Sequence, residues 1–151
     1  MLDHNFNLKL IDFGVAAPLG GTCGSDALRA KVGTPAYMVP EMLRGGEYSG
    51  VHTDVFAAGV VLFFMLTQRM PFAVADPDKD PLYRLLISGE SEHFWNIHAQ
   101  LEYNTCIHSD EFRRLFEQMM RLEPEGRLKI DEIRAQPWML QELPTCAQIK
   151  Q

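Results

Sequence analysis

The sequence predicts a mainly α fold with a small β-hairpin at its N-terminus, and three patterns lead to this prediction. An apolar run from Val55 to Leu66 lies within a helical segment, about residues 53–67. Residues 110–121 place their apolar side chains on one helical stripe. Residues 7–11 alternate between polar and apolar, as a short strand does. The length of 151 residues is enough for one hydrophobic core.

The first segment predicts two short strands. Leu8 and Leu10 fall on one face of residues 7–11, and residues 15–17 form a second apolar stretch after Gly14. Residues 18–25 contain several glycines among small polar residues and predict a loop.

The remaining chain predicts helices at 41–44, 53–67, 81–88, 110–121 and 129–135. The segment 53–67 is apolar almost all round, so it has to be covered by protein on every side. Ser109 is placed to cap the helix that begins at Asp110. The acidic loop that contains Asp76, Asp78 and Asp80 is interpreted as a solvated loop rather than as a site for basic substrates.

Composition narrows the partners and the compartment. A net charge of −6 argues against nucleic acid or an anionic membrane as the main partner. Cys23, Cys106 and Cys146 are odd in number and form no CxxC pair, which favours an intracellular location, cytoplasmic or nuclear. The run from Val55 to Leu66 is shorter than the roughly 20 residues that span a bilayer, so no membrane segment is predicted.

Three motifs follow one another along the chain. They are Asp12-Phe13-Gly14, the stretch GTPAYMVPE at residues 33–41, and DVFAAG at 54–59. In this order and spacing they resemble the activation segment and following helix of eukaryotic-type serine/threonine protein kinases. The resemblance covers essentially the whole chain and implies a partial kinase domain at 1–140. Within it, 12–41 would be the activation segment and 41–140 the helical C-lobe, followed by a tail at 141–151.

The resemblance implies a cofactor site at the N-terminus. Asp12 matches the aspartate that binds Mg²⁺ on ATP, Phe13 the residue that packs under the N-lobe, and Gly14 the point of a backbone flip. Met1 matches the apolar floor of the adenine pocket. ATP and Mg²⁺ are therefore the implied cofactors. From the residues alone, a turn residue after a strand is the better interpretation of Asp12, and only the resemblance favours metal ligation.

The same resemblance implies one positioning residue and three structural residues. Thr34 matches the threonine that braces the catalytic groups and indicates serine/threonine specificity; otherwise it is a turn residue. Glu41 and Arg127 match an ion pair that ties the activation segment to the last helices. Asp54 matches the acid that hydrogen-bonds the catalytic-loop backbone, with helix capping as the alternative.

The chain departs from the family pattern at several positions. Val39 replaces an alanine, and Ala30 stands where many members carry an activating threonine. Thr22 or Ser25 would then be the phosphorylated residue, unless the loop is unmodified. Lys129 replaces a helix-capping serine or threonine, which leaves only Glu132 of the capping box.

The glycine-rich ATP loop, the VAIK lysine and the HRD catalytic loop do not occur in the sequence. The expectation is that Met1 is not the natural start, that part of the helix 53–67 is exposed, and that the chain alone is inactive.

Two functions stay open. The chain is part of a kinase that transfers the ATP γ-phosphate to protein serine or threonine, or it is a non-catalytic kinase-like module that binds a protein partner through its helical surface. Oligomeric state is left open.

Overall fold

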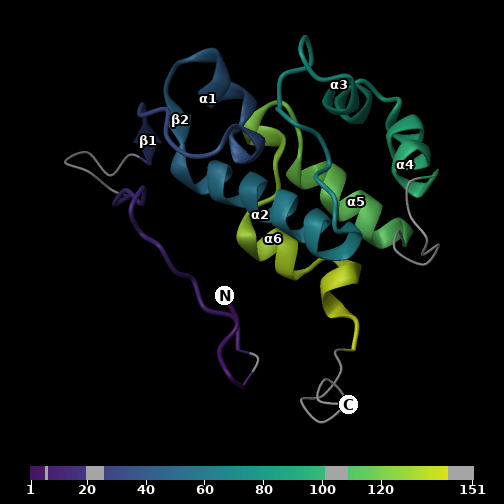
Figure 1. The fold of residues 1–151 in the computed structure, drawn as a ribbon, viewed down its shortest axis with the longest axis horizontal. Coiled ribbons are helices and arrows are strands. Elements are labelled where there is room, and N and C mark those ends of the chain that lie inside the picture. The colour runs from purple at the N-terminus through teal and green to yellow at the C-terminus, as the bar shows by residue number, and fades with distance from the viewer. Residues whose placement is uncertain (6, 20–25, 101–108, 143–151) are drawn as a thin grey trace.

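The computed structural model describes residues 1–5, 7–19, 26–100 and 109–142 (Figure 1). The mainly α fold class is confirmed. The α-helices are α1 (Pro40–Arg44), α2 (Gly50–Thr67), α3 (Pro81–Ile87), α4 (Ser91–Gln100), α5 (Asp110–Met119) and α6 (Ile130–Arg134). Single 3-10 turns are η1 (Pro35–Tyr37), η2 (Pro124–Gly126) and η3 (Pro137–Leu140).

The two strands lie elsewhere than predicted. β1 (Ala27–Leu28) pairs antiparallel with β2 (Tyr48–Ser49). The strands expected at 7–11 and 15–17 are wrong: the first region holds only an isolated bridge between Leu2 and Leu8. Alternation alone does not make a strand, because its apolar face needs a surface to pack on. Residues 1–5 and 7–19 instead form an exposed arm that leaves the helical body (Figure 1).

Helix α2 is the centre of the helical body. Its residues Phe56, Val60 and Phe63 are fully buried. A Cβ placed at Gly59 would collide with the Cε methyl of Met120 and lie 3.3 Å from Met119 Cβ. Glycine at this position therefore allows α2 to approach the end of α5 closely.

The opposite face of α2 is open, so the coverage on every side that its apolar composition predicted is not found among the described residues, whereas the expected exposure of part of the helix is. Val61, Phe64 and Met65 are 45%, 42% and 62% exposed. By length and composition, α2 is the one helix among the described residues that could cross a membrane, a test that core helices of soluble proteins also pass. Its buried side packs inside the helical body, so α2 is a core helix covered on one side only.

Helix α4 was not predicted from the sequence. Its aromatic residues Phe94 and Trp95 are fully buried and surround Phe63 at ring-centroid distances of 5.8 and 6.0 Å. The indole Nε1 of Trp95 donates to Glu117 Oε1 over 2.7 Å. Phe94, Trp95 and His98 have the i, i+1, i+4 spacing of a buried helical face, which is the signal that could have found α4.

His98 is the buried titratable group of α4. Its Nε2 lies 3.0 Å from the Pro71 carbonyl, and its Nδ1 is buried with no hydrogen-bond partner. Burial lowers the pKa of His98, with a further contribution from Arg69. The unfolded chain takes up this proton near pH 6.5 and the folded chain only at lower pH. Stability from this group is therefore present above pH 6.5 and lost as the pH falls below it.

We expect His98→Gln to flatten the fall in melting temperature between pH 7 and pH 5. One proton contributes at most about 1.4 kcal/mol per pH unit to the slope. Thermal unfolding at several pH values measures it, and His93→Gln, an exposed residue of the same helix, is the control. A His98→Gln profile parallel to that of the wild type would contradict the expectation.

Candidate functional site

The residues Asp12, Phe13 and Gly14 lie on the exposed arm. Asp12 has a left-handed backbone with φ of 61°, and its Oδ1 accepts the Gly14 N–H over 3.3 Å. The Ala16 N–H donates to the Phe13 carbonyl over 3.1 Å, so the three residues form a turn. Phe13 and Met1 are 70% and 73% exposed. In this structure the arm does not pack these side chains into a pocket.

The described residues do not by themselves form a metal site. No group of three or more His, Cys, Asp or Glu side chains that could hold a metal ion occurs in the described ranges. Asp12 supplies one carboxylate, already engaged by its own turn. Mg²⁺ takes near-octahedral oxygen coordination and is usually held through carboxylates together with substrate phosphates and water. A single exposed carboxylate does not fit that requirement.

Thr34 stands at the start of η1. Gly33 has φ of 104°, a left-handed conformation that favours glycine, and it turns the chain into Thr34. The Thr34 carbonyl accepts the Tyr37 N–H over 3.0 Å. The Thr34 side chain is exposed and caps no helix. Its hydroxyl is thus presented at the surface, while Val39 at 0% exposure anchors the segment behind it.

The structure brings Glu41 and Arg127 into direct contact. Arg127 Nη1 and Nη2 donate to the two Glu41 carboxylate oxygens over 2.6 and 2.7 Å. The remaining Arg127 donors reach the carbonyls of Arg121 at 2.8 Å and Leu122 at 3.1 Å. The side chains of Arg127 and Glu41 are 0% and 15% exposed, and the guanidinium lies 5.2 Å from the Phe56 ring centroid. This buried bidentate pair joins α1 to the turn that precedes α6.

Asp54 does not cap α2, so the capping alternative is wrong. The helix begins at Gly50, and the hydroxyl of Ser49 accepts the His52 N–H over 3.2 Å as its N-cap. Asp54 lies one turn further along the helix and is exposed. Its contact with a catalytic-loop backbone stays a prediction.

At the last helix, the remaining part of the capping box is present. The carboxylate of Glu132 accepts the Lys129 N–H over 2.7 Å at the start of α6.

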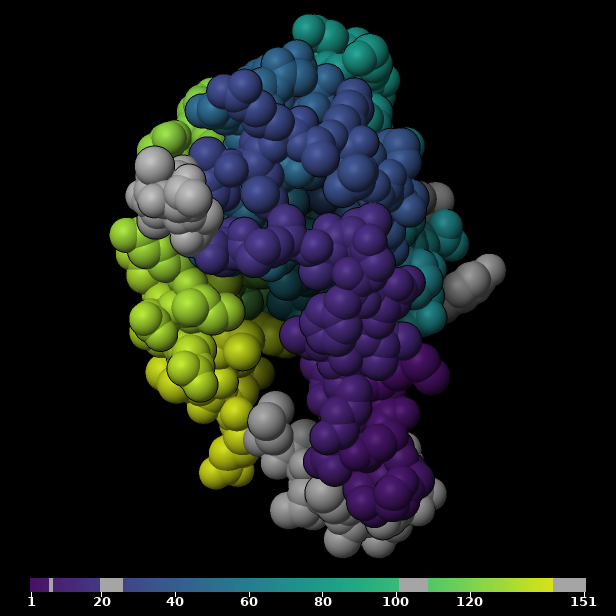
Figure 2. Space-filling model, turned by 90° about the vertical axis from the view of Figure 1, so that its left-hand side faces the viewer, coloured from purple at the N-terminus to yellow at the C-terminus, as the bar shows by residue number. Residues whose placement is uncertain are grey.

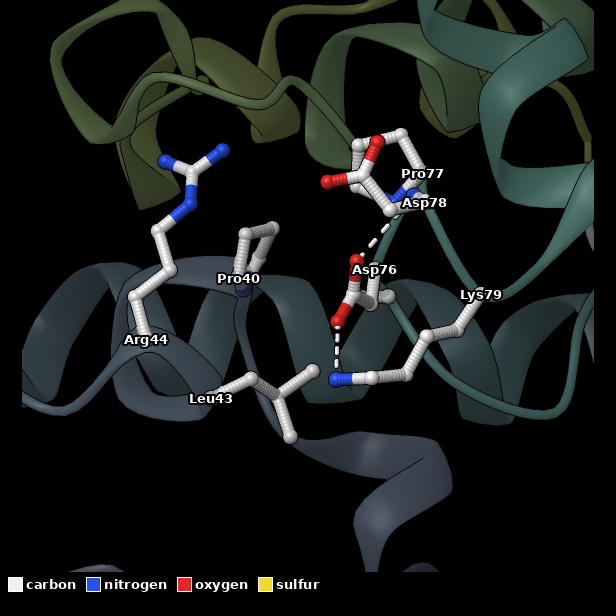
Figure 3. Close-up of a pocket in the computed structure, with 8 residues that line it drawn as sticks. Pro40, Leu43, Arg44, Asp76, Pro77, Asp78 and Lys79 are labelled. Atoms are coloured by element: carbon white, nitrogen blue, oxygen red, sulfur yellow. Dashed lines mark hydrogen bonds and ion pairs between the residues drawn. The ribbon is translucent and has the colours of Figure 1, made fainter.

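A pocket of about 230 Å³ lies between α1 and the turn at residues 75–79 (Figure 3). Asp76 faces into it, but its carboxylate is occupied by Lys79 Nζ at 2.6 Å and by the Asp78 N–H at 3.1 Å. The hydrogen bond from Lys79 is the main cause that lowers the pKa of Asp76. Arg44 extends along the other wall of the pocket (Figure 3).

Asp80 in the same loop is structural. Its residue is 6% exposed, and its two carboxylate oxygens accept four backbone N–H groups. These belong to Ala73 (2.7 Å), Val74 (3.2 Å), Leu82 (2.9 Å) and Tyr83 (3.2 Å). The solvated-loop interpretation is therefore wrong for Asp80, which is a buried cap of α3. Asp76 is paired with Lys79, and Asp78 is exposed.

Sequence reasoning missed the contacts that hold residues 26–31. Tyr48 Oη donates to the Ala30 carbonyl over 2.5 Å, and the Ser49 hydroxyl donates to Asp26. The partners are 18 and 23 residues apart in the sequence, so no local sequence pattern predicts these two contacts. Thr22 and Ser25, the predicted phosphorylation sites, lie outside the described residues.

Comparison with known proteins returns one family and many relatives. The protein kinase domain family matches residues 1–139. The chain is 33% identical over 146 residues to a maternal embryonic leucine zipper kinase of Danio rerio, covering 96% of this chain and 19% of that protein. It is 32% identical over 139 residues to CBL-interacting serine/threonine-protein kinase 5 of Arabidopsis thaliana, covering 92% and 28%. The chain thus spans about a fifth to a quarter of the length of these relatives.

Proposed function

Because the chain belongs to the protein kinase family, we propose that it is the C-lobe portion of a serine/threonine kinase that transfers the γ-phosphate of ATP to protein serine or threonine. The observation that supports this most is the buried bidentate pair between Glu41 and Arg127. It fastens the end of the GTPAYMVPE segment to the helical body, and Thr34 lies exposed at the start of that segment.

Protein kinases in general use ATP and Mg²⁺ and act on protein substrates. Phosphoryl transfer depends almost entirely on positioning and electrostatic stabilisation. In the proposed assignment, Asp12 is the magnesium ligand, Met1 and Phe13 border the nucleotide site, and Thr34 is a positioning residue. Among the described residues one exposed carboxylate is not enough to hold ATP and Mg²⁺ in place, so the proposal is that the 151-residue chain is not catalytically competent on its own.

We expect the purified 151-residue chain to show no phosphoryl transfer from labelled ATP to a generic protein substrate. Its incorporation of label should equal that of an Asp12→Asn variant and of a sample without protein. Transfer above that background that disappears in Asp12→Asn would contradict the expectation.

A second candidate, a non-catalytic kinase-like module, is favoured by one observation. The open face of α2 exposes Val61, Phe64 and Met65 on one side of a core helix. Exposed apolar patches of this kind mark surfaces that a partner protein covers. For either function we place the protein in the cytoplasm or nucleus, with a protein as substrate or partner.

The mass of the endogenous protein separates the two candidates. An immunoblot with an antibody raised against residues 109–142 measures it. A band at about twice the 17.2 kDa of this chain, or larger, leaves room for the missing kinase motifs and supports the kinase. A band at 17.2 kDa overturns the kinase proposal in favour of the binding module.

A further inference from the structure

Residues 26–31, called the strap here, lie along the segment that runs from α1 to the start of α2. The β1–β2 ladder pairs Ala27 with Ser49 and Leu28 with Tyr48. The Gly50 N–H extends this ladder by donating to the Asp26 carbonyl over 3.1 Å. Figure 2 looks at this side of the molecule, with the purple N-terminal residues in front of the blue segment.

Two side chains hold the strap from beneath. The Tyr48 residue is 6% exposed, and its hydroxyl reaches out of the core to donate to the Ala30 carbonyl over 2.5 Å. At the other end, the partly buried Ser49 hydroxyl donates to the Asp26 carboxylate. The ion pair between Arg29 and Glu47 at 2.6 Å adds little, because its side chains are 80% and 57% exposed.

The surroundings of the strap are acidic. Asp26, Glu41, Glu47 and Glu125 line a cavity of about 350 Å³ beside the strap. Glu41 is already paired with Arg127 and Glu47 with Arg29. A phosphate group placed here would therefore face the charges of Asp26 and Glu125, which have no ion-pair partner among the described residues, and like charges repel. The one arginine of the strap, Arg29, already pairs with Glu47.

Activation loops of kinases are commonly ordered by phosphorylation, through new pairs between arginine and phosphate. We propose that the strap of this protein is fastened without a phosphate, by Tyr48 and Asp26, so that the chain leading to Thr34 is positioned constitutively. The proposal concerns the order of the strap and holds for either function proposed above.

Trypsin cleavage of the full chain tests this directly, because Arg29 and Lys31 place two cleavable bonds inside the strap. Loss of one neutral hydrogen bond corresponds to about a fivefold change in the open population. We expect Tyr48→Phe, which loses a neutral hydrogen bond, to speed cleavage at these bonds by about fivefold, and Asp26→Ala, which loses a hydrogen bond to a carboxylate, by at least as much. Cleavage after Arg134 in α6 should not change, and the exposed Glu142→Gln is the control variant.

Phosphatase treatment of the wild-type protein from its native source completes the test, with no change in strap cleavage as the expected result. Faster cleavage after this treatment would overturn the proposal. Strap cleavage in both variants equal to that of Glu142→Gln would overturn it too. If Tyr48→Phe loosens the whole fold, cleavage after Arg134 rises with it, and Asp26→Ala, which changes a surface-side partner, then decides.

Discussion

Replacing Arg127 with alanine should lower the free energy of unfolding by about 3–5 kcal/mol, because it leaves the partner of a buried ion pair uncompensated. The Glu41 side chain is only 15% exposed, so its carboxylate cannot recover full hydration. The carbonyls of Arg121 and Leu122 lose their donors as well. Chemical or thermal denaturation measures the loss.

Arg134→Ala is the matched control for this change. Arg134 lies on α6, close in sequence, but its side chain is exposed. Exposed substitutions of this kind usually stay within about 0.5 kcal/mol. Because Glu41 and Arg127 act as one unit, the Glu41→Ala, Arg127→Ala double variant should lose less than the sum of the single changes. An Arg127→Ala protein as stable as Arg134→Ala would refute the structural role of the pair.

Phe63→Ala should be similarly damaging, at about 3–5 kcal/mol. Phe63 is fully buried where α2 meets α4 and α5, and its ring lies 4.8 Å from His98 and 4.9 Å from Phe116 between centroids. The cavity left by the missing ring would be bordered by aromatic residues that cannot collapse into it without leaving their own contacts.

The neighbouring Phe64 offers the sharpest control. It has the same chemistry on the same helix but is 42% exposed on the open face. We expect Phe64→Ala to cost about 1 kcal/mol, well below the cost of Phe63→Ala, because 42% of the residue already meets solvent and its loss leaves no enclosed cavity. Equal losses from the two variants, measured by urea denaturation, would mean that the open face of α2 is in fact packed.

The helices with strong local periodicity were predictable. The segment 53–67 became α2, and 110–121 became α5 with Ser109 as its N-cap, whose hydroxyl accepts the Phe112 N–H over 3.2 Å. The short segment 81–88 became α3. In each, the residues that cap the helix and those that form its buried stripe lie within a few positions of one another.

Two wrong secondary-structure predictions show what local sequence patterns cannot determine. The alternation at residues 7–11 has the right period for a strand, but Leu8 and Leu10 are 72% and 84% exposed. Among the described residues only an isolated bridge from Leu2 pairs with this segment, at Leu8. Conversely, α4 was missed although Phe94 and Trp95 are among its buried residues. A short segment with mixed polarity becomes a helix because α2 and α5 offer its aromatic face a place to pack.

The sequence by itself determined the mainly α class and the family resemblance, because these depend on residue types and on their order. The ion pair between Glu41 and Arg127 was expected only through that resemblance. Tertiary structure decided what that pair is: a bidentate contact at 2.6 and 2.7 Å around a guanidinium with no exposed surface. It also decided that Asp12 lies in an exposed turn and that Tyr48 holds the strap. The physical reason is the separation of the partners along the chain. Hydrogen bonds and burial join residues that are 18 to 86 positions apart, whereas a local sequence pattern covers only a few neighbouring positions.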